Sequence, residues 1–458
     1  MNALRFLLMA PALIIVSPVP HLFSQTPADE DYRAFNDSPR LLLTRQRLRL
    51  LQRERERQSM RWQQFDTLVT SGAPMPEPGF ALGLYYRVSG NSAVGRRAVD
   101  WAIGEGSDLR QLALVFDWCG PVMSKTQADQ LAAKLERGLA SATNDASHDI
   151  REQDGRALAA IALADRLPDQ GESVLRPLVQ KWWRENVVKR ITSPRSLGDV
   201  AIPREQAYVL YELMHALRDN LKIDLRESAP DFFKNLPIDH LVGHYPSPFQ
   251  GPENEYHVPV YVHNGEPDLT DAVLSRAAEF AMVAYDDNAP ESQYLQGWLI
   301  QDRFLMRGPL GAPYEFLWAN PYQPGLNYDN VPLIFHDPAT GHVFARTNWD
   351  EDATWIGYFD GHLQLFQDGQ IQTLKAGAAT KPVRVGTAVL LSAQKPDAVQ
   401  FHADSETIFV LSLKPQSHYD VEIDDEELSE MEADAGGTLV LTFPEGADAG
   451  VRIRLRNE

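Results

Sequence analysis

The chain has 458 residues, of which 44% are hydrophobic, and it contains nine tryptophans. This composition predicts a globular protein with room for two or three domains and excludes a largely disordered chain. The formal net charge of −20 disfavours nucleic acid as a partner, because phosphate binding needs clustered lysine and arginine.

The first residues have the layout of a secretory signal peptide. Arg5 precedes an apolar run from Phe6 to about Val19, and small and polar residues follow it. Three prolines interrupt the run and it is short for a membrane span, so removal of residues 1–25 is favoured over anchoring. We therefore expect a periplasmic or extracellular protein, with no stable membrane insertion after cleavage.

Residues 36–306 predict a succession of roughly ten helices. Leu131, Leu135 and Leu139, for example, recur every four residues, which places them on one helical face. Several of these segments are apolar on most faces, as expected for the inner helices of a double-layered array. No sequence repeat of about 30 to 50 residues is visible, which disfavours a simple solenoid.

The composition changes after the helices. Residues 307–332 hold five prolines and three glycines, which predicts a linker with neither a helix nor a central strand. Residues 333–458 then alternate apolar and polar side chains, as in "TLVLTF", where Leu439, Leu441 and Phe443 share one side. We therefore expect a helical domain, a linker and an antiparallel β-sheet domain.

The single cysteine, Cys119, lies in the apolar stretch "VFDWCGP" and has no partner for an internal disulfide. It is expected to be a buried thiol.

Three phrases resemble the heparinase II/III-like and alginate-lyase-like polysaccharide lyases. They are "SPRLLLTRQRLRLL" at 38–51, "LALVFDWCGPVMSKTQADQL" at 112–131 and "HVFARTNWDEDATW" at 342–355. The resemblance implies an (α/α) toroid followed by an antiparallel β-sandwich, with substrate held between them. It also implies cleavage of uronate-containing glycans by β-elimination, with no cofactor. A tyrosine from the helical part and a histidine from the β part would transfer the protons.

β-Elimination needs a group that neutralises the uronate carboxylate and groups that move two protons. The segment "FQGPENEYHVPVY" (249–261) offers Tyr256, which resembles the proton-transferring tyrosine of the family, although two extra residues follow its "QG". His257 could assist, and Gln250 and Asn254 could bind the acidic sugar. The alternative is that Tyr256 packs under the loop and that His257 is solvated.

Three further candidates lie outside this segment. Glu205 could act in catalysis, or it could simply interact with the dipole of the helix that it opens. Arg346 could bind a carboxylate through two hydrogen bonds, although an ordinary ion pair is equally consistent. Trp318 could stack on a sugar ring, although core packing explains a single tryptophan as well.

The stretch "GHLQLFQDGQ" (361–370) supplies the β-domain candidate, His362. Gln364 stands where the family would place a second histidine, so we expect no metal site here. Asp-Gly dipeptides flank the run and predict two tight hairpins. Leu363 and Leu365 would then face one side, and His362 and Gln364 the other.

Three functions remain open at this stage. The chain is expected to be a polysaccharide lyase, a catalytically inactive glycan-binding or structural relative, or a glycoside hydrolase that uses two carboxylates. The absent histidines favour the inactive relative. An oligosaccharide or polysaccharide is the expected partner in each case.

Overall fold

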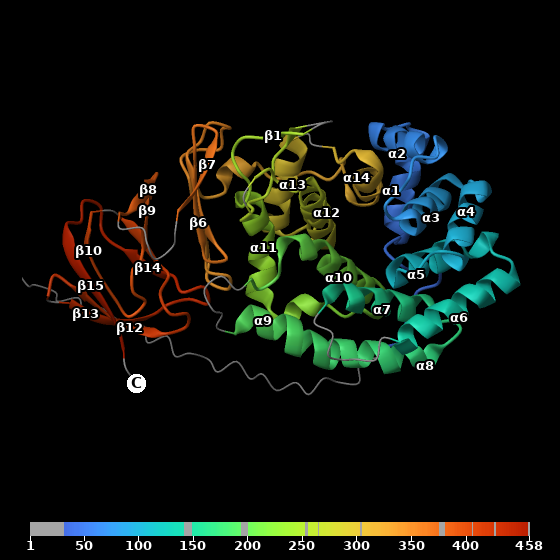
Figure 1. Ribbon diagram of the computed structural model, residues 1–458, viewed down its shortest axis with the longest axis horizontal. Helices are drawn as coiled ribbons and strands as arrows, with labels where there is room; N and C mark the ends of the chain where they lie inside the picture. The colour runs from blue at the N-terminus through green and yellow to red at the C-terminus, as the bar shows by residue number, and fades with distance from the viewer. Residues whose placement is uncertain are drawn as a thin grey trace, which may run out of the picture. The chain divides into compact units, whose positions relative to one another are not determined.

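The helices lie in the N-terminal two thirds of the chain and the large sheets in the C-terminal third (Figure 1). The computed structural model describes residues 32–141, 149–193, 200–251, 255–263, 265–302, 305–374, 381–404, 406–425 and 427–456. The predicted signal peptide, residues 1–25, lies outside these ranges. The order of a helical part followed by a sheet part, predicted from the change of period, is confirmed.

The α-helices are α1 (Arg45–Glu56), α2 (Met60–Thr70), α3 (Pro78–Ser89), α4 (Ser92–Ile103), α5 (Leu109–Trp118), α6 (Lys125–Ser141), α7 (Ile150–Ala162), α8 (Pro168–Gln170), α9 (Lys189–Thr192), α10 (Ala207–Leu221), α11 (Pro230–Val242), α12 (Leu269–Tyr285), α13 (Pro290–Asp302) and α14 (Gly308–Trp318). The helical part also has 3-10 segments, namely η1 (Gly120–Val122), η4 (Arg204–Gln206), η5 (Leu225–Ser228) and η6 (Tyr328–Asn330), and two π-helical segments, η2 (Gly171–Leu175) and the longer η3 (Leu178–Val188).

Side-chain caps set where several helices begin. The side chains of Thr44, Asn91 and Asp108 accept hydrogen bonds from backbone amides in the first turns of α1, α4 and α5. These bonds satisfy amides that have no partner within the helix. Short polar residues therefore separate the apolar helical runs along the chain.

Six helices contact one another in succession. They are α3, α5, α7, α10, α12 and α14, and α14 in turn contacts α3. The helices of this ring carry many of the largest buried side chains, including Trp118, Tyr208 and Phe316. A ring of contacting helices is what the predicted (α/α) toroid requires, and the toroid itself stays a prediction.

The prediction that prolines exclude a helix from residues 307–332 is wrong for α14. Pro309 lies in the first turn, where its missing amide proton would have had no partner. Pro313 lies inside the helix, where it removes one hydrogen bond. Burial of Tyr314, Phe316 and Trp318 outweighs that loss, since tertiary packing commonly overrides helix propensity.

The C-terminal strands form three sheets. The first sheet is an antiparallel meander of β3 (Ile334–Asp337), β4 (His342–Arg346), β5 (Trp355–Phe359), β6 (His362–Gln367) and β7 (Gln370–Leu374). The second has the order β14 (Leu439–Thr442), β11 (Thr407–Leu411), β9 (Ala388–Ser392) and β8 (Val383–Val385). The third has the order β10 (Ala398–Ala403), β15 (Ala449–Leu455), β12 (His418–Ile423) and β13 (Glu427–Glu432). The strand pairs are antiparallel except β9 with β11, which is parallel and departs from the prediction.

Alternating side chains stack these sheets in layers. On β4, Val343 packs with residues of the second sheet such as Leu390, whereas Phe344 belongs to the core shared with the helices. Val389 of the second sheet and Ile453 of the third lie in one hydrophobic core, so the second sheet packs on the third. The meander therefore lies between the helical part and the second sheet, and one of its faces can contribute to a site with the helices.

The predicted hairpins are present at both ends of β6. Asp360 and Gly361 have φ values of 48° and 75°, and Asp368 and Gly369 have values of 52° and 72°. Two successive positive φ angles are typical of a type I′ turn, which explains why both turns are Asp-Gly. Cys119 is a fully buried free thiol, as predicted. Within the described ranges, no helix has both the length and the hydropathy needed to cross a membrane.

Candidate functional site

A histidine of the meander meets an aspartate of α11 where the two parts of the chain touch. His342 Nδ1 lies 2.8 Å from Asp239 Oδ2, and His342 Nε2 lies 3.2 Å from Asp360 Oδ1. Burial alone would lower the pKa of His342, but the two carboxylates outweigh it and raise the pKa to about 10. Both ring nitrogens therefore carry protons at neutral pH and donate to the carboxylates.

A cavity of about 60 Å³ adjoins this histidine–aspartate cluster, and its wall includes Arg204, His240 and His342. Since a water molecule takes about 30 Å³ in the liquid, the cavity holds about two waters and no sugar ring. Arg204 and His342 bring two cations to one small space. Asp239 and Asp360 line the same cavity and pair with His342, so two carboxylates offset these two cations.

A second cluster surrounds Glu279 of α12, whose side chain is fully buried. Its Oε1 lies 3.1 Å from the Arg204 guanidinium and 3.2 Å from His244 Nε2, and its Oε2 lies 3.1 Å from Arg276 Nε. Burial alone would raise the pKa of Glu279, but His244 and Arg276 outweigh it and hold the pKa well below its usual value. Glu279 is therefore an anion of α12 that joins η4 and the segment after α11.

The Glu279 cluster continues through Arg276 to the predicted catalytic loop. Arg276 donates to Asp302 Oδ2 at 2.7 Å, and Asp302 Oδ1 bonds Nδ1 of His257. Burial alone would raise the pKa of Asp302, but Arg276 and His257 lower it to about 2. His257 Nε2 lies 3.2 Å from the carbonyl oxygen of Pro246, so both of its nitrogens face acceptors. In this geometry contacts within the fold occupy both ring nitrogens of His257.

The loop is tied to the meander by one glutamine. Tyr245 donates its hydroxyl proton to Gln364 Oε1 at 2.7 Å, and Gln364 Nε2 donates to the carbonyl oxygen of Tyr261 at 2.8 Å. Trp355 adds a bond of 3.1 Å from its indole nitrogen to the carbonyl oxygen of Val242. The residue that replaces the expected second histidine thus links the helical part to β6.

Of the two predicted proton-transfer residues, Tyr256 belongs to the helical part and His362 to the meander. Tyr256 is buried on β2 (Glu255–Tyr256), which pairs with β1 (Phe249–Gln250). His362 begins β6, is half-buried, and packs against Phe359 with the ring centroids 6.4 Å apart. His362 and Gln364 lie on one face of β6, about 7 Å apart along the strand.

The remaining candidates are bound within the fold or lie apart from this contact. Gln250 is exposed and donates to Glu255 Oε1 at 2.6 Å across the β1–β2 hairpin. Buried Arg346 donates from Nε to the carbonyl oxygen of Asn348 at 2.6 Å, and its guanidinium lies 4.2 Å from the ring centroid of Trp349.

Trp318, also buried, donates its indole proton to Tyr208 Oη at 3.2 Å. Glu205 is half-buried in η4, where its neighbour Arg204 is the residue that joins the Glu279 cluster. Asn254 lies outside the described residues.

Sequence reasoning missed most members of the two clusters, although two signals were available. His240 and His244 are four residues apart in "DHLVGH", a spacing that brings residues together at a helix end, and His244 Nδ1 lies 2.7 Å from the carbonyl oxygen of His240. Arg276 and Glu279 are charged residues inside the otherwise apolar run "AVLSRAAEFAMVAY". Charges in such a run predict a buried and paired network. Among the described residues, no group of three or more His, Cys, Asp or Glu side chains is arranged to hold a metal ion.

The sequence matches no protein-family model and no curated protein. Among solved structures, a chain described as a glycoside hydrolase is 10% identical with a TM-score of 0.31, over 83% of this chain and 71% of that chain. The heparan sulfate lyase HepC from Pedobacter heparinus is 12% identical with a TM-score of 0.35, over 82% of this chain and 75% of that one. Both are carbohydrate-active proteins, but these scores are too low to establish a shared fold or to support an argument about function.

Proposed function

We propose that this protein is an exported carbohydrate-active enzyme that cleaves uronate-containing glycans by β-elimination where the helical part meets the meander. The observation that carries the proposal is the convergence of acid–base and cationic side chains from both parts. His342 of β4 bonds Asp239 of α11, and the Tyr245 loop is fixed to Gln364 of β6. A site assembled from two packed parts is a common location for ligand binding.

The reaction places three demands on this contact. A cation must neutralise the uronate carboxylate, a base must take the proton from the adjacent carbon, and an acid must protonate the leaving oxygen as the carbon–oxygen bond breaks. We assign the first demand to Arg204, a cation in the wall of the small cavity that His342 and its carboxylate partners Asp239 and Asp360 also line. We assign the two proton transfers to Tyr256 and His362, and we assign His257 to positioning because both of its nitrogens are engaged.

A second function is supported by a different observation. Gln364 serves as a hydrogen-bonded link between the two parts, and the ring nitrogens of His257 and His342 are already bonded to neighbouring groups. A catalytically inactive relative that only binds an acidic glycan would show the same features. The two functions differ in whether a product forms.

Product chemistry separates these possibilities. The purified full-length chain would be incubated with polygalacturonate, alginate and heparan sulfate, and ultraviolet absorbance and new reducing ends would be recorded. β-Elimination produces both an unsaturated uronate that absorbs and a reducing end. Hydrolysis produces reducing ends alone, and binding produces neither.

A matched pair of variants tests the assignment of Tyr256. Tyr256→Phe is expected to lower kcat by about 10²- to 10⁴-fold, which is the usual contribution of a proton-transferring group. Tyr86→Phe in α3 is the control, since Tyr86 is equally buried and lies in a helix that does not reach the meander. Equal turnover by Tyr256→Phe and the wild type would remove Tyr256 from the mechanism.

A further inference from the structure

A cavity of about 980 Å³ lies between α1 and the C-terminal ends of α10, α12 and α14. Its wall carries six arginines and only two aspartates, although the whole chain has 43 basic and 63 acidic residues. The arginines are Arg45, Arg47, Arg49, Arg53, Arg57 and Arg218. The wall of this cavity is therefore rich in positive charge, although the chain as a whole is strongly acidic.

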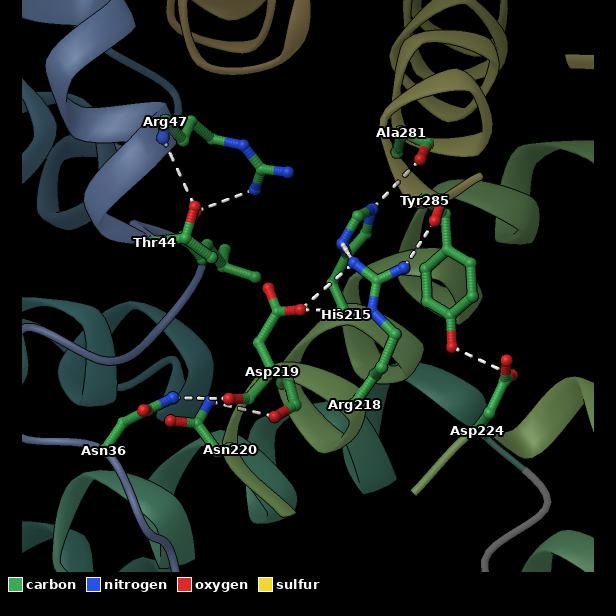
Figure 2. Close-up of polar contacts among 12 residues, drawn as sticks. Asn36, Thr44, Arg47, His215, Arg218, Asp219, Asn220, Asp224, Ala281 and Tyr285 are labelled. Atoms are coloured by element: carbon green, nitrogen blue, oxygen red, sulfur yellow. Dashed lines mark hydrogen bonds and ion pairs between the residues drawn. The ribbon is translucent and has the colours of Figure 1, made fainter. Parts of the chain in front are cut away.

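Two of the six arginines are used to build the wall (Figure 2). Arg47 donates to the carbonyl oxygen of Leu42 at 2.7 Å and lies 4.1 Å from the ring centroid of Trp318. Arg218 lies 3.2 Å from His215 Nδ1, bonds the carbonyl oxygen of Tyr285, and covers the Tyr285 ring at 3.8 Å. Their positions are fixed by the fold, with or without a ligand.

The other four arginines form a stripe along α1. Arg45, Arg49, Arg53 and Arg57 recur every four residues, and all four are exposed. None of them makes an ion pair with any carboxylate in the part of the chain that the structure describes. Like charges at this spacing repel one another and destabilise a helix slightly. The stripe therefore costs the free protein stability. The guanidinium of Arg57, at the C-cap of α1, lies 5.3 Å from the ring centroid of Tyr322, and those of Arg45, Arg49 and Arg53 are available to a ligand.

A neutral donor in the same wall also lacks an acceptor. Gln323 Nε2 is buried and finds no hydrogen-bond partner among the described residues. A buried donor without a partner costs about 1–3 kcal/mol. Because Nε2 itself is shielded from the cavity, the arginine stripe is the feature that favours a ligand there.

The cavity is separate from the catalytic contact proposed above. Arg204, which precedes α10, belongs to the Glu279 cluster, whereas Arg218 near the end of α10 lines the cavity. At 1.5 Å per helical residue, these two positions are about 20 Å apart.

We propose that this cavity is a second carbohydrate site, which binds a short oligosaccharide bearing several carboxylate or sulfate groups. Guanidinium groups bind such oxygens through paired hydrogen bonds. The volume is within the range of ordinary ligand pockets, of about 300–1,000 Å³, and Asn320 and Gln323 can bond sugar hydroxyls. The overall charge of −20 disfavours a long polyanion such as nucleic acid, which would also meet the acidic surface. That the ligand is a glycan rests on the proposed function.

Calorimetric titration of the full-length chain tests the site, with tetragalacturonate as the acidic probe and cellotetraose as the neutral one. The variant Arg49→Gln/Arg53→Gln removes two charges from the stripe. The variant Arg96→Gln/Arg97→Gln is the control, because it removes two charges from exposed positions on α4. We expect the stripe variant to bind tetragalacturonate about tenfold more weakly than the wild type, or weaker still, and the control to change by less than about twofold.

Equal binding by the stripe variant and the wild type would overturn the proposal, and so would an equal loss in the control. Inorganic tripolyphosphate tests the sugar requirement, since binding as tight as that of tetragalacturonate would overturn the carbohydrate assignment. The absorbance assay keeps the two proposals apart. Arginine-dependent binding without any product would refute the lyase and leave the cavity site standing, whereas product with arginine-independent binding would refute the cavity site alone.

Discussion

The charged side chains around Glu279 are paired within the fold, whereas the arginines along α1 are exposed and lack carboxylate partners among the described residues. At the helix–meander boundary Glu279 is fully buried and contacts Arg204, Arg276 and His244 within 3.2 Å. Along α1 the arginines are exposed, follow one another every four residues, and have no carboxylate partner among the described residues. The comparison indicates that paired buried charges hold this fold together, whereas unpaired charges beside a cavity are available to a ligand.

The largest expected effect comes from removing the anion at the centre of the Glu279 cluster. Glu279→Gln preserves the shape of the side chain but removes the carboxylate that pairs with the buried guanidinium of Arg276 and the half-buried guanidinium of Arg204. Breaking a buried pair in this way is expected to lower the free energy of unfolding by about 3–5 kcal/mol. Urea denaturation measures the change.

The control for this prediction is Glu172→Gln, which breaks an exposed pair with Arg176 at 2.7 Å. Exposed pairs of this kind contribute about 0.3–0.5 kcal/mol. A loss of similar size in both variants would show that burial does not distinguish the two pairs.

The pH dependence of stability tests the His342 cluster. The pKa of His342 rises from 6.5 to about 10 on folding, so its stabilising contribution is complete below pH 6.5 and is lost as the pH rises toward 10. His342→Gln is therefore expected to be less stable than the wild type at pH 6.5. The difference in their free energies of unfolding, the gap between the two proteins, should narrow as the pH rises. At its steepest, the difference in the free energy of unfolding between the two proteins should change by about 1.4 kcal/mol per pH unit. Denaturation of both proteins between pH 6 and 10 measures the gap.

The other titratable groups are common to both proteins, and comparing the two proteins cancels their contribution. His263→Gln serves as the control because His263 is exposed. A gap between the wild type and His342→Gln that stays constant over the range would contradict the assignment of His342 as a buried cation.

A smaller effect is expected from the link between the loop and the meander. Tyr245→Phe removes the hydroxyl that donates to Gln364 at 2.7 Å and leaves that buried amide oxygen without a donor. We expect a loss of about 1–2 kcal/mol in the free energy of unfolding. Tyr261→Phe is the comparison, since the Tyr261 hydroxyl donates to the carbonyl oxygen of Gly265 at an exposed position. Indistinguishable losses would mean that the Gln364 link contributes nothing particular.

The smallest effect is predicted for the stripe itself. Arg49→Gln/Arg53→Gln breaks no ion pair among the described residues and relieves repulsion along α1, so the free energy of unfolding should change by less than about 0.5 kcal/mol. The same denaturation experiment measures it. A loss of several kcal/mol would assign these arginines to the fold and would remove the contrast between the two regions.

Local patterns predicted a substantial part of the fold. The four-residue spacing of Leu131, Leu135 and Leu139 and the Asp-Gly turns beside β6 depend on neighbouring residues, and the structure contains the predicted helix and hairpins. The α14 helix was missed, because its prolines argue against a helix and its stabilising contacts come from distant segments.

The candidate site could be predicted only in part, because its contacts join distant positions. Arg204 and Glu279 are 75 residues apart, and His342 and Asp239 are 103 residues apart. Sequence spacing carries no signal for such pairs. The stripe on α1 is local and visible in "TRQRLRLLQRERER", but its lack of carboxylate partners is evident only from the structure.

The most direct test of the difference between the two charged regions is thermal unfolding with and without tetragalacturonate, applied to the wild type, Arg49→Gln/Arg53→Gln and Glu279→Gln. A ligand that binds only the folded state raises the unfolding midpoint. We predict that the ligand raises the midpoint of the wild type and of Glu279→Gln, which starts lower. The arginine variant should unfold at the wild-type midpoint without ligand, and the ligand should raise its midpoint by clearly less than that of the wild type. A ligand-induced rise in the arginine variant equal to that of the wild type would contradict the account.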